Sequence, residues 1–164
     1  MEKSNSLLIN RKLPVRTTIF IIIITAVFII VLTMIGEKDP VVNVLDDRIE
    51  IKSMFGTTIS KDDIAEISIL DKSMREIGVG SRTNGYGGFT GTYKGHFKAN
   101  DGSAMLVFAQ VDAVPTIQIQ TKNGPPVFIS FRDSNKTKEL VQDLIEKYQL
   151  MLPLDYFNDY YGSQ

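Results

Sequence analysis

The chain has 164 residues, among them 18 Lys and Arg, 19 Asp and Glu, one His, and no Cys or Trp. Without cysteine it can form no disulfide, no thiolate zinc site and no cysteine nucleophile. Residues 1–36 carry four basic and one acidic side chain, whereas residues 37–164 carry 14 basic and 18 acidic ones. Because the larger part is acidic, we expect no nucleic-acid partner.

Residues 17–36 contain no charged side chain and are mostly isoleucine, valine, threonine and phenylalanine. A helix over residues 17–35 would span roughly 28 Å at about 1.5 Å per residue, close to the thickness of the bilayer hydrocarbon. We therefore predict a transmembrane helix at residues 17–36. A buried core helix would have a polar face, and a cleaved signal peptide would have a shorter apolar stretch followed by small residues, so both alternatives are disfavoured.

Basic residues are concentrated before this apolar stretch. Four precede it, whereas Lys38 is the only one in residues 36–45 and lies between Glu37 and Asp39. The positive-inside rule then places residues 1–16 in the cytoplasm as a short tail. The predicted location is the cell membrane, crossed once, with a cytoplasmic N-terminus and an extracytoplasmic C-terminal domain.

Alternating apolar and polar side chains predict a domain built mainly of strands at residues 41–149. Ile49 and Ile51 alternate with charged neighbours, and the same period of two recurs further along the chain. Asp46-Asp47 and Asn100-Asp101-Gly102 are typical of turns between strands. About seven short antiparallel strands are expected, at residues 48–55, 57–60, 65–70, 92–99, 104–110, 116–121 and 126–131.

One amphipathic helix is predicted to close the domain. It begins near residue 134, and its apolar face carries Thr137, Leu140, Val141, Leu144, Ile145 and Tyr148. In the strand at residues 92–99, we expect Lys94, His96 and Lys98 on the polar, solvated face. The only histidine has neither convergent ligands nor a base partner in view, so we expect no metal site and no catalytic residue.

Residues 71–91 hold six glycines and no regular apolar period. A phosphate-binding loop would need a Gly-Lys-Ser/Thr ending and a following helix, and neither is present. Two interpretations stay open. The segment is a long flexible connection between strands, or it is a recognition loop that presents Arg75, Arg82 and Tyr86.

Residues 150–164 form an aromatic-rich C-terminal tail. Its aromatic side chains could pack on the domain, dock a partner or lie at a membrane interface. They are Tyr156, Phe157, Tyr160 and Tyr161. Together with Arg75, Arg82, Tyr86 and Lys94, they are the candidate interaction residues.

Three short stretches carry a resemblance to a known family: FGTTI at residues 55–59, RTNGY at residues 82–86 and KGHFKANDG at residues 94–102. With the strands and helix around them, residues 41–148 resemble the bacterial pleckstrin-homology-like (PH-like) domains often found in membrane-anchored proteins. The resemblance implies an α+β, mainly β fold: a strongly bent antiparallel sheet or split barrel with a C-terminal amphipathic helix. It also implies no enzymatic activity and a role as a binding or assembly platform.

The basic cluster with which some PH domains bind inositol lipids is not matched here. The corresponding region offers Asp46 and Asp47, with only Lys52 and Lys61 around the next turn. The resemblance therefore implies no inositol-lipid site.

The first functional hypothesis is a membrane-anchored protein-interaction or assembly module. Its contact surfaces would be the glycine-rich segment, the aromatic tail, or an exposed edge strand that adds an extended peptide. The alternative is a module that binds anionic lipid headgroups through Arg75, Arg82, Lys94 and Lys98. An enzyme is disfavoured, because nucleophile, base and metal ligands do not assemble. The expected partners are the lipid bilayer, through residues 17–36, and an unknown protein; a homo-oligomer stays open, and no cofactor is expected.

Overall fold

The computed structural model describes residues 14–148 of the chain, which divides into two units, residues 1–35 and residues 36–164. Helix α1, Val15–Gly36, begins after Pro14, whose carbonyl accepts the amides of Thr17 and Thr18 at 2.9 and 3.1 Å. Proline suits this position because a helix leaves its first amides without internal partners. The helix predicted from the apolar stretch is confirmed.

The large apolar side chains of α1 are exposed on all sides. Two of its threonines bond back into the helix: the Thr18 hydroxyl donates to the carbonyl of Pro14 at 3.5 Å and the Thr33 hydroxyl donates to the carbonyl of Ile29 at 2.9 Å, each one turn earlier. Within residues 14–148, α1 is the one helix long and apolar enough to cross a membrane. Such a helix is compatible with a single-pass anchor and also with an N-terminal signal sequence.

The second unit begins with a three-stranded antiparallel sheet in the order β1-β2-β3. Its strands are β1 Val41–Val44, β2 Arg48–Lys52 and β3 Thr57–Ser60. Asp46 and Asp47 form the predicted turn, which the amide of Leu45 closes by donating to the carbonyl of Arg48 at 2.8 Å. One face of this sheet is buried, through Val44, Ile49, Ile51 and Ile59.

A six-stranded sheet follows, in the order β4-β8-β9-β7-β6-β5. The strands are β4 Ile64–Leu70, β5 Val79–Gly87, β6 Thr92–Ala99, β7 Ala104–Gln110, β8 Thr116–Thr121 and β9 Val127–Ser130. All neighbours are antiparallel except β7 and β9, which pair in parallel. The helical segments of the unit are a 3-10 turn at Lys61–Asp63, α2 at Met74–Ile77 and α3 at Ser134–Tyr148.

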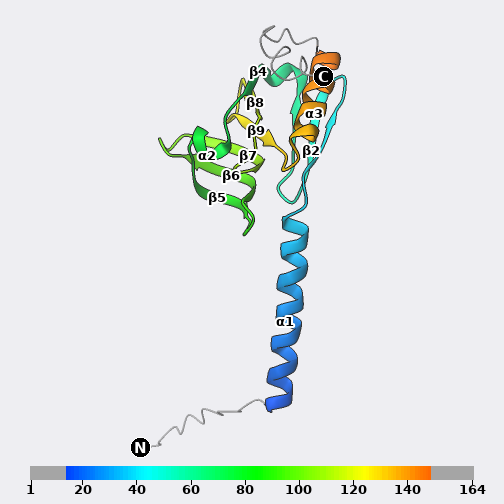
Figure 1. Ribbon diagram of the computed structural model, residues 1–164, viewed down its shortest axis with the longest axis vertical. Coiled ribbons are helices and arrows are strands. Elements are labelled where there is room, and N and C mark those ends of the chain that lie inside the picture. The colour runs from blue at the N-terminus through cyan, green and yellow to red at the C-terminus, as the bar shows by residue number, and fades with distance from the viewer. Residues whose placement is uncertain (1–13, 149–164) are drawn as a thin grey trace, which may run out of the picture. The chain divides into compact units, whose positions relative to one another are not determined.

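Two apolar clusters form the core, and α3 and α2 belong to different ones. Figure 1 shows the two helices over different parts of the second unit. The larger cluster joins the buried face of the three-stranded sheet to the six-stranded sheet and to the apolar face of α3, through Leu140, Val141 and Leu144. The smaller cluster lies under α2 and includes Met74, Phe97, Met105, Val107 and Phe128. The amphipathic helix predicted near residue 134 is therefore confirmed, along with its buried face.

The prediction for residues 71–91 is wrong, because this segment is regular. Ser73 and Glu76 form a capping box: the Ser73 amide donates to the Glu76 carboxylate at 2.8 Å, and the Glu76 amide donates back to the Ser73 hydroxyl at 3.4 Å. Helix α2 follows, and then the nine residues of β5. Glycine is needed where β5 meets β6, since a Cβ on Gly85 would collide with the carbonyl of Lys94.

The predicted number of strands and the prediction that all of them pair antiparallel are also wrong. The described residues contain nine strands in two sheets, where about seven antiparallel strands were expected. The added strands are β1 and β5, whose sequences lack a clean period of two. The parallel pair arises because the β8–β9 hairpin inserts β9 between β8 and β7.

Candidate interaction site

A polar cluster surrounds residues 36–39, which lead from α1 to β1. At its centre is Lys94 on β6, which is only 2 % exposed. Its ammonium donates to the carbonyl of Gly36 at 2.7 Å and to the carbonyl of Lys38. Burial disfavours the charged form and lowers the pKa of Lys94, against the opposing effect of two nearby carboxylates.

The predicted exposure of Lys94 is therefore wrong. Alternation places it on the polar face of β6, but at this end of the strand residues 36–38 cover that face and supply hydrogen-bond acceptors. Further along the same strand, His96 and Lys98 are exposed, as predicted.

Glu37 is the second charged member of the cluster. Its carboxylate accepts hydrogen bonds from the hydroxyls of Tyr86 at 3.0 Å, Thr92 at 2.7 Å and Thr90. Burial acts to raise the pKa of Glu37, but the three hydroxyl donors together outweigh it and hold the pKa below its ordinary value. Burial and the bond to Glu37 raise the pKa of Tyr86. Arg132 adds a longer ion pair to Glu37 at 3.9 Å.

These contacts hold residues 36–38 on β5 and β6. Both charged groups at the centre, Glu37 and Lys94, are engaged inside the cluster, so the arrangement is suited to positioning a chain segment and not to acid–base chemistry. Sequence reasoning missed Glu37, Thr90 and Thr92. The one signal for them is a charged residue placed directly after the apolar stretch.

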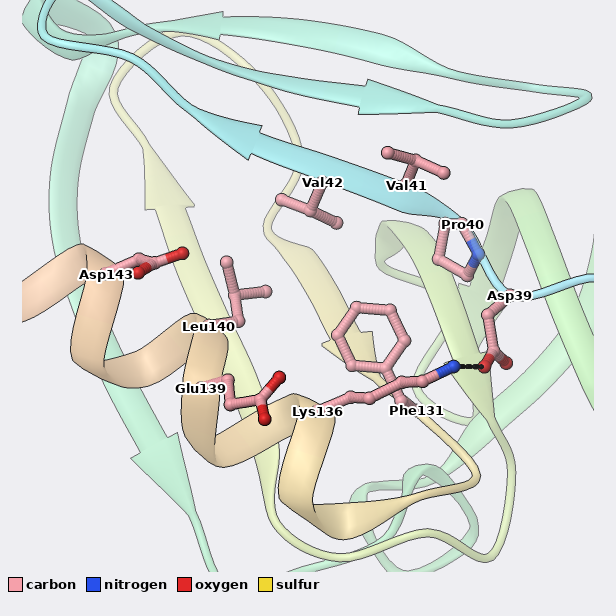
Figure 2. Close-up of a pocket in the computed structure, with 9 residues that line it drawn as sticks. All are labelled: Asp39, Pro40, Val41, Val42, Phe131, Lys136, Glu139, Leu140 and Asp143. Carbon is pink, nitrogen blue, oxygen red and sulfur yellow. Dashed lines mark hydrogen bonds and ion pairs between the residues drawn. The ribbon is translucent and has the colours of Figure 1, made fainter.

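An open hollow of about 380 Å³ lies between the start of β1 and helix α3 (Figure 2). Val42, Phe131 and Leu140 point toward one another into it, from β1, the residue after β9 and α3. On one side Lys136 reaches across to Asp39, with 3.0 Å between its ammonium and the carboxylate. That ion pair raises the pKa of Lys136.

The rim of the hollow is mainly acidic. Asp39, Glu139 and Asp143 line it, against the single cation Lys136. Within residues 14–148, neither Glu139 nor Asp143 forms an ion pair. The combination of an apolar floor and a negative rim favours a ligand that carries both apolar and positively charged groups.

Strand β1 borders the hollow and is an edge strand. In the part of the chain that the structure describes, β2 is its only partner strand. Because Leu45 and Arg48 form a hydrogen-bonded pair, the antiparallel pattern turns the backbone groups of Val42 and Val44 away from β2. Such outward-facing amides and carbonyls are the groups that an added strand would bind.

Of the predicted interaction residues that the structure describes, Tyr86 and Lys94 come together as opposite residues on β5 and β6, whereas Arg75 and Arg82 are not part of that cluster. Arg75 on α2 forms an exposed ion pair with Asp112 at 2.7 Å. Arg82 and Tyr86 both lie on β5, but Arg82 is exposed while Tyr86 bonds Glu37. The aromatic tail lies outside the described residues, and with it Tyr156, Phe157, Tyr160 and Tyr161.

The four cations suggested for anionic headgroups form no common exposed patch. Lys94 is buried and Arg75 is paired with an acid, which leaves Arg82 and Lys98 exposed on neighbouring strands. Across residues 14–148, no three His, Asp or Glu side chains are placed together to hold a metal ion. Comparison of the chain with protein-family models, with curated proteins and with solved structures found no match. Function therefore has to be inferred from the apolar helix, the hollow and the free strand edge.

Proposed function

We propose that the chain is a single-pass membrane protein whose second unit binds a protein partner through an extended segment of that partner. In this proposal α1 crosses the bilayer, the N-terminus lies in the cytoplasm and the unit from residue 36 onward lies outside. Its support is the apolar, exposed surface of α1 and the excess of basic residues before it.

The second unit is proposed to be a PH-like, non-enzymatic binding module. Two sheets dominated by antiparallel pairs, with an amphipathic helix after the last strand, support this assignment. The parallel β7–β9 pair is a departure from a simple antiparallel barrel. Since a fold alone does not define a function, the proposal depends on the site and not on the architecture.

The observation that carries the proposal is the hollow beside the free edge of β1. An extended peptide could bind the outward-facing backbone of Val42 and Val44 and place a side chain over Phe131 and Leu140. The volume of about 380 Å³ is at the lower end of the range for ligand pockets, about 300–1,000 Å³, and suits one or two apolar side chains.

Charge defines the partner further. The carboxylates of Glu139 and Asp143 lie along the rim on α3, where they would attract Lys or Arg next to the apolar side chain. The predicted ligand is therefore an extended segment in which apolar and basic residues occur together. Binding to such a rim would weaken at high salt.

Photo-crosslinking tests this proposal. A photoreactive amino acid replaces Glu139, an exposed residue of α3 that lines the hollow, or Lys98, an exposed control on β6. In intact cells we expect a discrete protein adduct from position 139 and none from position 98. Asp143→Lys should reduce the adduct, whereas Glu146→Lys, also on α3 but outside the hollow, should leave it unchanged. Equal adducts from both positions, or an adduct indifferent to Asp143→Lys, would contradict the proposal.

A further inference from the structure

The described part of the second unit has three exposed large hydrophobic side chains. They are Val41, Met54 and Phe89, with exposed fractions of 58, 44 and 93 %. A single exposed apolar side chain is ordinary on a protein surface, but an exposed group of them marks a contact site. Whether these three form a group depends on where the fold places them.

Phe89 lies in the turn between β5 and β6, which the amide of Gly88 closes by donating to the carbonyl of Thr92 at 2.8 Å. The residues on both sides of Phe89 touch Glu37. The Thr90 hydroxyl donates to its carboxylate, and a Cβ added to Gly88 would overlap that carboxylate. Phe89 is therefore held next to the residue that directly follows α1.

Met54 and Val41 also lie near the segment that follows α1. Val41 is five residues after Gly36, and it pairs with Lys52, two residues before Met54 in the β2–β3 turn. Phe55, the next residue, has its Cβ within 3.1 Å of the Cβ position of Gly95.

Gly95 in turn adjoins Lys94, whose ammonium is bonded to the carbonyl of Gly36. All three exposed apolar residues, Val41, Met54 and Phe89, are thus connected by direct contacts or a few residues of chain to residues 36–41.

The next step depends on the proposed anchoring by α1. If α1 spans the hydrocarbon, Gly36 lies at its boundary whatever the tilt of the helix, and Glu37 lies one residue beyond. The headgroup layer on each side is about 5–7 Å thick, so side chains next to Glu37 are within reach of it. On amphipathic segments that lie in the interface, apolar side chains such as Phe and Leu bury at the boundary between headgroups and acyl chains.

We infer that Phe89, Met54 and Val41 form a membrane-contact surface that inserts into the interface of the bilayer that α1 crosses. The occupant is lipid and not a second protein, because Phe89 lies next to Glu37, and Val41 and Met54 lie a few residues of chain or one contact away from the segment that leaves the bilayer. The hydrogen bonds of Glu37 to Tyr86 and Thr92, and of Lys94 to Gly36, support this inference, since they hold the β5–β6 turn against residues 36–38.

The absence of tryptophan from the sequence makes this inference directly testable. Phe89→Trp and, separately, Met54→Trp are made in the full-length chain, which is reconstituted into vesicles of phosphatidylcholine brominated on the acyl chains, near the headgroup in one preparation and near the bilayer centre in another. Two controls are Phe28→Trp, within α1, and Asp62→Trp, exposed beyond β3 at the opposite end of the three-stranded sheet from Val41. We expect blue-shifted, bromine-quenched emission from Phe89→Trp and Met54→Trp, and neither effect from Asp62→Trp.

The remaining outcomes distinguish the inference from the anchoring on which it rests. If Phe28→Trp is quenched while Phe89→Trp and Met54→Trp emit like Asp62→Trp, α1 is in the membrane and the contact surface is refuted. If Phe89→Trp is blue-shifted but not quenched, and the shift disappears on dilution of the protein in lipid, a second copy covers the surface and the inference is again refuted. If Phe28→Trp is itself unquenched, the anchoring fails and the inference fails with it.

Discussion

Replacement of Lys94 by methionine probes the polar cluster around residues 36–39 most directly. Methionine keeps an unbranched apolar stem but removes the ammonium that donates to the carbonyls of Gly36 and Lys38. Gly36 is buried, so its unpaired carbonyl would cost about 1–3 kcal/mol. Lys38 is exposed, so water can replace the lost bond there at about 0.5–1.5 kcal/mol.

One effect opposes this loss. A buried ammonium carries a desolvation cost of several kcal/mol, part of which the variant no longer has. We expect a net loss of about 1–3 kcal/mol in the free energy of unfolding of the second unit. For a unit of this size, that corresponds to a melting temperature lower by roughly 4–12 °C.

The pH dependence gives a second readout of Lys94. Because burial lowers its pKa, the unfolded chain binds the proton more tightly than the folded chain does. This penalty is fully present below the folded pKa and disappears as the pH rises from the folded pKa to the ordinary lysine value near 10.4. The stability of the wild type relative to Lys94→Met should therefore increase as the pH rises toward the ordinary lysine value.

Urea unfolding of the full-length chain in detergent micelles, followed by the circular dichroism of the strands, measures both effects. The matched control is Lys98→Met, an exposed lysine on the same strand, which should change stability by less than about 0.5 kcal/mol. If Lys94→Met is as stable as the wild type at neutral pH, and if the wild type gains no stability relative to the variant as the pH rises, the assigned role of this side chain is refuted.

Three further predictions concern single contacts. Glu37→Gln should lower the free energy of unfolding of the second unit at neutral pH, and the difference from the wild type should become smaller below about pH 4.5. The reason is that a carboxylate with a lowered pKa stabilises the fold above its unfolded pKa and loses this effect as acid protonates it. Unfolding of both proteins measured across the acid range checks this. Thr137→Val should cost about 1–3 kcal/mol in urea unfolding, since the buried hydroxyl accepts the amide of Phe131 at 3.1 Å and valine leaves that amide unpaired. Arg75→Ala should leave the melting temperature unchanged, because the ion pair with Asp112 is exposed on both sides.

Local periodicity in the sequence was enough to predict several elements. Helix α1 can be predicted from its uncharged apolar stretch alone, because that prediction depends on no contact with another part of the chain. Strand β2 and helix α3 follow from apolar residues at spacings of two and of three or four, and Asp46-Asp47 marks the first hairpin. The capping-box spacing of Ser73 and Glu76 also indicates the start of helix α2, but the glycines that follow favoured the prediction of a loop.

The intrinsic preference of each segment can therefore be predicted from its own residues: an apolar helix, short strands, turns and an amphipathic helix. The division into two sheets, the parallel β7–β9 pair, the hollow beside β1 and the burial of Lys94 could not be predicted in this way. Strand pairing and burial depend on residues far apart in the chain. Lys94 and Gly36 are 58 positions apart, and a lysine on a polar strand face is solvated until another segment covers it and supplies the acceptors its ammonium requires.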